Sequence, residues 1–211
     1  MSPLRFLFPL VCPLLLIAVQ AEAGEEVKES KATVVESPFD KGKYEIQLGA
    51  GAFSSFQPTT STRPGFTDID AAIRAGVMLN TPDGSGFLRG NFEFLLEGYG
   101  ALLVEGPRTG YAGLGLMLRY NFVQPDSAWV PYFQIQGGGV YNDIYHDGSQ
   151  RVFGSALEFD LGGGLGMRYI FSPRCGAFLE ADYRHISNAG TAARNLGLNS
   201  MGGFLGVSVF F

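Results

Sequence analysis

The sequence has few of the residues that mark disulfide-bonded, nucleic-acid-binding or metal-dependent proteins. It holds two cysteines and two histidines in 211 residues. It has no run of lysines and arginines, and its net charge of -5 argues against a nucleic-acid partner. We find no cluster of metal ligands and no phosphate-binding loop, so no metal or other cofactor is predicted. No segment shows a sustained helical period, which favours an all-β fold.

Residues 1–23 are predicted to be a secretory signal peptide. An apolar run follows one arginine, and residues 21–23 have the spacing of an A-x-A cleavage site. An uncleaved helical anchor is the alternative, but Pro9 and Pro13 lie inside the apolar run and would break a spanning helix. After cleavage Cys175 is the single remaining cysteine, so no internal disulfide can form.

The mature chain divides into a charged segment, 24–43, and a periodic segment, 44–211. The first lacks an apolar period and is predicted to be a flexible periplasmic tail. In the second, apolar and polar residues alternate, as they do in strands whose successive side chains point to opposite faces. Eight such strands are predicted, near residues 44–54, 67–79, 87–103, 110–122, 129–142, 153–171, 177–187 and 199–211.

These strands predict an eight-stranded antiparallel transmembrane β-barrel of the bacterial outer membrane. Eight is an even number, each strand is long enough to span a bilayer when tilted, and the polar faces are rich in glycine. Short turns are expected at 81–84, 124–127 and 172–174, with longer outer connections between the other strand pairs. A secreted sandwich or lipocalin-like barrel is the alternative, but its water-facing side would then be unusually neutral.

A candidate catalytic pair lies at the end of strand 177–187, where His185 and Ser187 share the apolar face. Histidine is suited to take the proton of a serine hydroxyl near neutral pH. Counting back in twos from Phe211 puts Asn199 on the same face of the last strand, within reach of His185. Asn188, or backbone N–H groups that follow it, could stabilise an oxyanion. From spacing alone, an interfacial histidine beside a strand-end serine is the simpler explanation.

The run YRHISNAG at residues 183–190, followed by NLGLNS at 195–200 and a terminal strand, resembles the lipid A 3-O-deacylase (PagL-type) family. The resemblance implies a small outer-membrane barrel that hydrolyses the ester-linked acyl chain at position 3 of lipid A. It also implies that His185 is the base, Ser187 the nucleophile and Asn188 an oxyanion contributor. The best-known members carry a glutamate as the third triad residue, where this chain has Asn199.

This difference leaves two expectations for the serine esterase: either its activity is low, or Asn199 turns its amide so that the oxygen faces the histidine. The carbonyl of Asn199 can accept the histidine N–H, but it brings no charge to stabilise an imidazolium. In a serine protease, exchanging the triad aspartate for asparagine lowers kcat by about 10⁴. The expected partners are lipid A or lipopolysaccharide and outer-membrane lipid, and a homodimer is left open. The alternative function is a non-catalytic barrel with a structural or surface-interaction role.

Overall fold

The computed structural model describes residues 37–56, 65–106 and 109–211. The predicted signal peptide, 1–23, and residues 24–36 of the predicted tail lie outside this part of the chain. Among the described residues, no helix is long and apolar enough to cross a bilayer.

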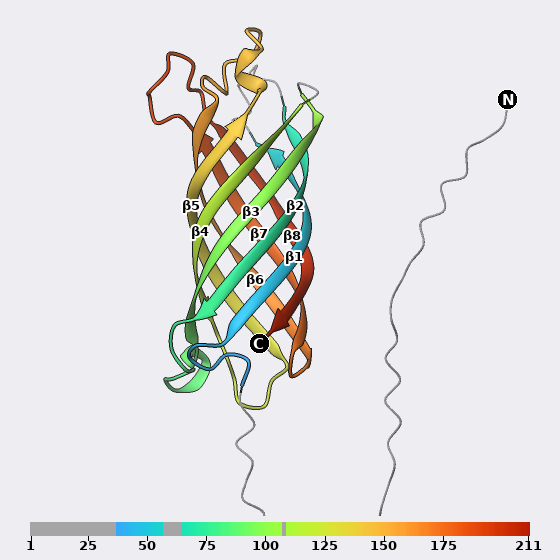
Figure 1. The fold of residues 1–211 in the computed structure, drawn as a ribbon, viewed down its shortest axis with the longest axis vertical. Coiled ribbons are helices and arrows are strands. Elements are labelled where there is room, and N and C mark those ends of the chain that lie inside the picture. Colours follow the sequence, from blue (N-terminus) through green and yellow to red (C-terminus); the bar gives the residue numbers. More distant parts are fainter. Residues whose placement is uncertain (1–36, 57–64, 107–108) are drawn as a thin grey trace, which may run out of the picture. The chain divides into compact units, whose positions relative to one another are not determined.

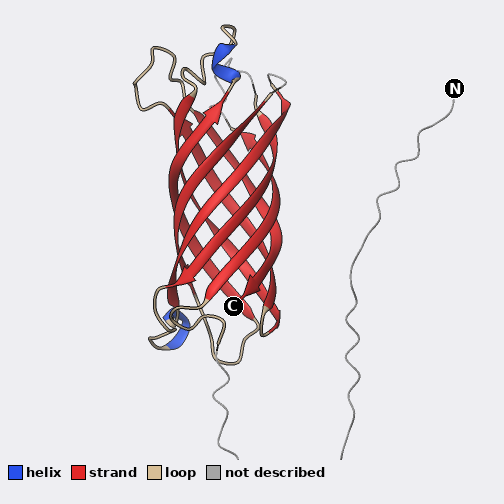
Figure 2. Cartoon of the chain, viewed as in Figure 1, coloured by secondary structure: helices blue, strands red, loops and turns tan. Residues whose placement is uncertain are grey.

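Eight strands form a closed antiparallel barrel, in which each strand pairs with its neighbours in sequence and β1 pairs with β8 (Figure 1). This confirms the predicted fold. Two 3-10 helices, η1 Gly86–Leu88 and η2 Ile144–His146, lie in connections between strands (Figure 2). The strands are β1 Tyr44–Ser55, β2 Thr67–Met78, β3 Asn91–Glu105, β4 Gly110–Asn121, β5 Trp129–Asn142, β6 Leu157–Ser172, β7 Cys175–Ser187 and β8 Leu198–Phe210.

The two ends of the barrel differ. The turn end carries the connections β2–β3, β4–β5 and β6–β7 together with the start of β1 and the end of β8. The loop end carries the other four connections, including residues 143–156 and 188–197. β7 runs toward the loop end, so Ser187, its last residue, lies there.

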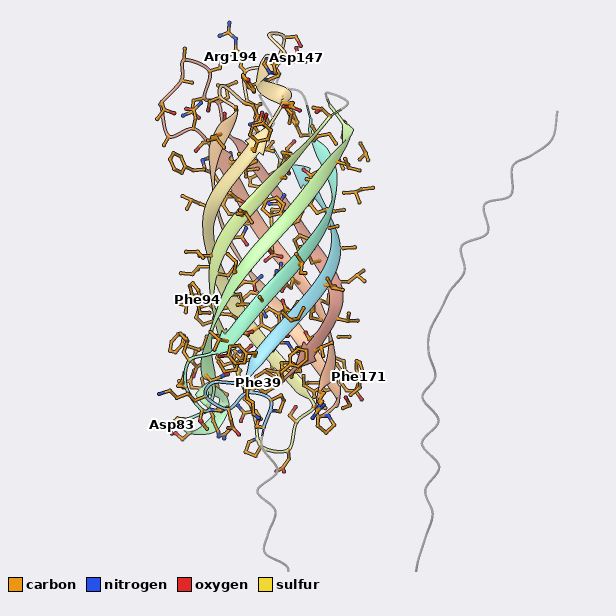
Figure 3. The ribbon with its side chains drawn as sticks, in the orientation of Figure 1. Phe39, Asp83, Phe94, Asp147, Phe171 and Arg194 are labelled. Carbon is orange, nitrogen blue, oxygen red and sulfur yellow. The ribbon has the colours of Figure 1, made fainter. Side chains whose placement is uncertain are left out.

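Side chains alternate between the outer wall and the lumen, as the sequence period predicts (Figure 3). On β7, Leu179 and Tyr183 are exposed on the outer wall, whereas Glu180, Asp182 and Arg184 are buried in the lumen. A closed barrel has no free strand edge, so the polar backbone groups of the wall bond between strands. The apolar outer wall is therefore compatible with lipid.

The predicted strand 87–103 begins too early. β3 starts at Asn91, and η1 forms just before it. Gly84 and Gly86 have φ values of 97° and 59°, in the left-handed region that favours glycine. The chain turns there, and the connection 79–90 is longer than the short turn that was expected.

The predicted strand 153–171 also begins too early, since β6 starts at Leu157. Phe153, the first residue of that predicted strand, is fully buried. The N–H groups of Val152 and Phe153 donate to Oε1 of Gln150 at 2.7 and 2.8 Å. These local hydrogen bonds compete with strand pairing and turn the chain inward.

Apolar clusters occupy both ends of the lumen. At the loop end, the Phe153 ring lies 6.0 Å from that of Phe66 and 6.2 Å from that of Tyr111. At the turn end, the rings of Phe39 and Phe210 are 5.6 Å apart. Together with their neighbours, these rings form buried apolar clusters on either side of the polar middle of the lumen.

Phe39 belongs to the described end of the segment predicted to be flexible, residues 37–43. Its ring is buried, and its carbonyl accepts a hydrogen bond from Nδ2 of Asn91 at 2.9 Å. Residues 37–43 are therefore held against the turn end of the barrel.

Charged side chains fill the middle of the lumen, and four arginines there lie beside carboxylates. Removing charges from water costs several kcal/mol per ion, so a buried pair needs close contacts to offset this penalty. The contacts are Arg74 with Glu97 (2.5 Å) and Glu180 (2.8 Å), Arg119 with Glu93 (3.5 Å), Arg168 with Glu45 (2.8 Å), and Arg184 with Asp70 (2.6 Å).

Two other lumenal carboxylates bind uncharged groups. Glu158 accepts the N–H of Gly154 at 2.7 Å, and Asp182 accepts Nε2 of Gln134 at 3.0 Å. Glycine in the wall makes room for aromatic rings in the lumen: a Cβ at position 166 would lie 2.2 Å from the Tyr132 ring. The strand alternation identifies the lumenal residues but not which of them touch.

Arg74→Met removes the charge between Glu97 and Glu180 and leaves both carboxylates buried without it. We expect the free energy of unfolding to fall by about 3–5 kcal/mol. Urea unfolding in detergent micelles, followed by the fluorescence of Trp129, measures this change. Arg174→Met, at an exposed turn position, is the control and should stay within about 0.5 kcal/mol. Equal effects of both substitutions would argue against a stabilising lumenal network.

Candidate active site

The ends of β7 and β8 bring the three predicted catalytic side chains together on the outer wall. His185 and Asn199 are directly opposite in the strand register. Nε2 of His185 lies 3.0 Å from Oγ of Ser187, and Nδ1 lies 2.8 Å from Oδ1 of Asn199. All three residues are half-buried. Because the three residues lie on the same face of two adjacent strands, their side chains form one continuous series of hydrogen bonds.

These contacts fit a neutral imidazole with its hydrogen on Nδ1. The N–H then donates to the amide oxygen of Asn199, and the lone pair of Nε2 accepts the hydroxyl of Ser187. This is the arrangement that a general base beside a nucleophile requires. It depends on the oxygen of Asn199, rather than its NH₂ group, facing the ring.

The chain turns sharply after Ser187. Ala189 and Gly190 have φ values of 53° and 84°. A left-handed conformation is uncommon for alanine and marks local strain next to the serine. Gly190 N–H donates to Oδ1 of Asn188 at 3.0 Å. Within the described part of the chain, the N–H of Ala189 has no hydrogen-bond acceptor, so a donor is left open beside the nucleophile.

Asn188 is fully buried, and its polar atoms bond within the loop that follows Ser187. Its Nδ2 donates to the carbonyl of Arg194 at 2.8 Å, and its backbone N–H donates to Oδ1 of Asn195 at 3.0 Å. In this arrangement the side chain orders the loop. The oxyanion role expected from the sequence motif stays a prediction.

Arg194 connects this loop to its neighbour at the loop end. Its guanidinium donates to the carbonyls of Asp147 (2.8 Å), Gln150 (3.2 Å) and Tyr145. Figure 3 shows Arg194 and Asp147 close together at that end. The side chain of Arg194 therefore joins the connections 143–156 and 188–197, which are also linked by the Leu196 N–H donating to the carbonyl of Arg151 at 3.1 Å.

Gly197 lies directly against the candidate base. Its φ is 66°, and a Cβ there would lie 3.0 Å from Cε1 of His185. A side chain at this position would both strain the backbone and press on the imidazole. Gly197 therefore helps to define the place of the ring.

Sequence reasoning missed three residues around the site: Tyr183, Arg194 and Gly197. The side chain of Tyr183 points to the outer wall, as that of His185 does, and its hydroxyl donates to Oδ1 of Asn199 at 2.8 Å. The alternation in the sequence indicates this outward direction, but the contact with Asn199 depends on the register between β7 and β8. The roles of Arg194 and Gly197 depend on loop conformations that carry no periodic signal.

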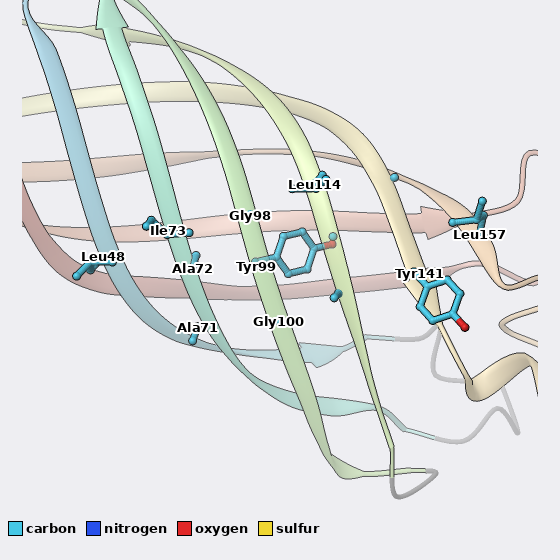
Figure 4. Close-up of a pocket in the computed structure, with 13 residues that line it drawn as sticks. Leu48, Ala71, Ala72, Ile73, Gly98, Tyr99, Gly100, Leu114, Tyr141 and Leu157 are labelled. Carbon is cyan, nitrogen blue, oxygen red and sulfur yellow. The ribbon is translucent and has the colours of Figure 1, made fainter.

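A groove of about 900 Å³ lies on the outer wall (Figure 4). Its lining is mostly small or apolar and includes Ala71, Gly98, Gly100 and Leu114. None of the candidate catalytic residues lines it. Within the described ranges, no group of three or more histidine, cysteine or acidic side chains is arranged to hold a metal ion.

The sequence matches the lipid A 3-O-deacylase (PagL) family over residues 71–208. A comparison with curated proteins gives no significant match. Among solved structures, the fold is similar to that of the outer membrane enzyme PagL, with a TM-score of 0.52 and 17% identity over 77% of this chain and 97% of that one.

Two further solved structures are similar. Neisserial surface protein A has a TM-score of 0.49 and 17% identity, over 81% of this chain and 98% of that one. OprG from Pseudomonas aeruginosa has a TM-score of 0.45 and 14% identity, over 83% and 99%. The family match covers more than half of the sequence, and it agrees with the closed barrel and its apolar outer wall. The chain therefore belongs to the lipid A 3-O-deacylase (PagL) family and is a β-barrel of the bacterial outer membrane.

Proposed function

We propose that this chain is a serine esterase that removes the 3-O-linked acyl chain of lipid A. The hydrogen-bonded series Ser187–His185–Asn199 on the lipid-facing wall carries this proposal, with contacts of 3.0 and 2.8 Å. Family membership supports lipid A or lipopolysaccharide as the substrate. The position of the series at the loop end supports access from the outer leaflet.

In the first half of the reaction, Oγ of Ser187 attacks the ester carbonyl while Nε2 of His185 takes the hydroxyl proton. The tetrahedral intermediate collapses as the bond to the sugar oxygen breaks. His185 gives its proton to that oxygen, which leaves as the 3-hydroxyl of lipid A. The acyl group is then esterified to Ser187.

In the second half, water attacks the acyl-enzyme and His185 takes the proton of the water. Collapse of the second intermediate breaks the bond to Ser187, whose oxygen receives the proton from His185. The products are a free fatty acid and the restored serine. The chemistry needs no redox step and uses only side chains and water.

The oxyanion of both intermediates requires hydrogen-bond donors. The N–H of Ala189 is a candidate, because it follows the nucleophile closely and has no acceptor among the described residues. Asn188 is the second candidate, by its carboxamide as the motif implies or by ordering the loop that presents this N–H. Loss of one such donor typically lowers kcat by about 10²–10³.

A non-catalytic barrel is the second candidate function, and the identity of Asn199 favours it. A carboxamide supplies no negative charge beside the imidazolium that forms during acyl transfer. In that case His185 and Ser187 would be interfacial polar groups on a barrel with a structural or surface role.

Ser187→Ala tests the esterase directly. We expect the unmodified chain, expressed in a Gram-negative host, to remove one 3-hydroxyacyl mass from lipid A, and the variant to remove none. Mass spectrometry of extracted lipid A measures this, with electrophoretic heat-modifiability as the control for folding. Unchanged lipid A with both folded proteins would instead support the non-catalytic barrel.

Asn199→Asp introduces a negative charge beside His185 and leaves the size of the side chain almost unchanged. We expect kcat to rise at least about tenfold, because the carboxylate stabilises the imidazolium and has no unproductive orientation. The measurement is the initial rate of ester hydrolysis in mixed micelles. A rate that is unchanged or lower would mean that the charge of this residue does not limit the reaction.

A groove of about 460 Å³ on β1, β7 and β8 offers a path for the acyl chain along the wall. These are the strands of the candidate site and their neighbour, and the lining includes Ala52, Leu179 and Leu205. The groove begins about three residues beyond Asn199 along β8, a distance of roughly 10 Å at strand rise.

Ala52→Phe should obstruct this groove. We expect kcat/KM for a long-chain ester to fall about tenfold, while hydrolysis of a short-chain ester stays within twofold. Ala112→Phe, on the outer wall of β4, is the matched control and should change neither. A uniform loss for both chain lengths would point to a folding defect rather than an acyl-chain site.

A further inference from the structure

The amide oxygen of Asn199 accepts two hydrogen bonds. One comes from the His185 ring at 2.8 Å and the other from the Tyr183 hydroxyl at 2.8 Å. Tyr183 precedes His185 by two residues on the same face of β7, so both side chains reach the same atom of β8. Nothing in the proposed acyl transfer uses Tyr183.

The environment of Tyr183 holds its hydroxyl in place. Its ring is 39% exposed on the outer wall and packs on Phe56 with the ring centroids 6.1 Å apart. The N–H of Phe56 in turn donates to the backbone carbonyl of Asn199 at 3.1 Å. Phe56 therefore contacts both Tyr183 and Asn199, the two residues that the hydroxyl hydrogen bond joins.

A carboxamide at position 199 has two different ends, an oxygen and an NH₂ group, whereas the two oxygens of a carboxylate are equivalent. With its oxygen on the imidazole, Nδ1 of His185 carries the hydrogen and Nε2 can accept a proton from Ser187. With its NH₂ group on the imidazole, Nδ1 must accept, the hydrogen moves to Nε2, and the base is lost. Only one of the two amide orientations supports catalysis.

Tyr183 distinguishes between the two orientations. With the amide oxygen facing it, the phenol hydrogen has an acceptor. With the NH₂ group facing it, the phenol oxygen meets a donor and its own hydrogen is left without an acceptor. Within the described residues, Tyr183 makes no other side-chain hydrogen bond. On an apolar wall an unmade hydrogen bond is costly, so the productive orientation is favoured.

We propose that Tyr183 is a positioning residue that holds the oxygen of Asn199 on His185 and so keeps the imidazole in its reactive tautomer. The inference rests on the proposed esterase function for its kinetic consequence. Its structural consequence, the tautomer of His185, is independent of any substrate.

The kinetic test compares Tyr183→Phe in two backgrounds, the natural Asn199 and Asn199→Asp. Phenylalanine keeps the ring and its packing on Phe56 and removes only the hydroxyl. With Asn199, kcat should fall about tenfold with KM unchanged. With aspartate it should fall less than about twofold, because the two carboxylate oxygens are equivalent. Tyr141→Phe, also exposed on the outer wall, is the control and should leave kcat unchanged.

The tautomer test uses nitrogen NMR of histidine-labelled protein in micelles. His146→Gln removes the second histidine, so that all signals belong to His185. We expect hydrogen on Nδ1 in the parent, and a shift toward hydrogen on Nε2 when Tyr183→Phe is added.

The two tests separate the proposals. Equal kinetic losses in both backgrounds, or an unchanged tautomer in Tyr183→Phe, would overturn the positioning role. A tautomer shift in a protein that hydrolyses no ester would preserve that role and overturn the esterase.

Discussion

The guanidinium of Arg74 lies between Glu97 and Glu180 in the middle of the lumen, and the other three lumenal arginines are held in similar surroundings. In the middle of the lumen these ion pairs occupy the place that apolar side chains take in a soluble protein, while apolar clusters lie at the two ends. The ion pairs set the direction of the side chains on β1, β2, β3, β4, β6 and β7, because a shift of one residue in any of these strands would move charges into lipid. The rest of the structure, including the candidate site, depends on that constraint.

The same alternation that buries Glu180, Asp182 and Arg184 puts His185 and Ser187 on the outer wall. The position of the site therefore depends on the packing of the lumen as much as on the local sequence. Its remaining geometry comes from the loop end, where Asn188 and Arg194 hold the segment after the serine. A rigid wall positions the base and the nucleophile, and an ordered loop positions the backbone beside them.

The alternation of side chains between the two faces of a strand explains which features the sequence could predict. A period of two residues assigns each side chain to a face, and this was enough for the eight strands and for the shared face of His185, Ser187 and Asn199. It does not report pairing across the lumen, so it cannot identify the contacts of Glu158 with Gly154 or of Asp182 with Gln134. It also fails where side chains bond to nearby backbone, as Gln150 does before β6. Tyr183 required the register between two strands as well as its own parity.

The placement of Ser187 on the outer wall has a consequence for how a substrate would arrive. A nucleophile that faces the bilayer meets lipid by lateral diffusion in two dimensions rather than by capture from bulk water. Encounter frequency would then follow the mole fraction of the target lipid in the leaflet. Changes in membrane composition or fluidity would regulate such an enzyme without touching a single residue of the protein.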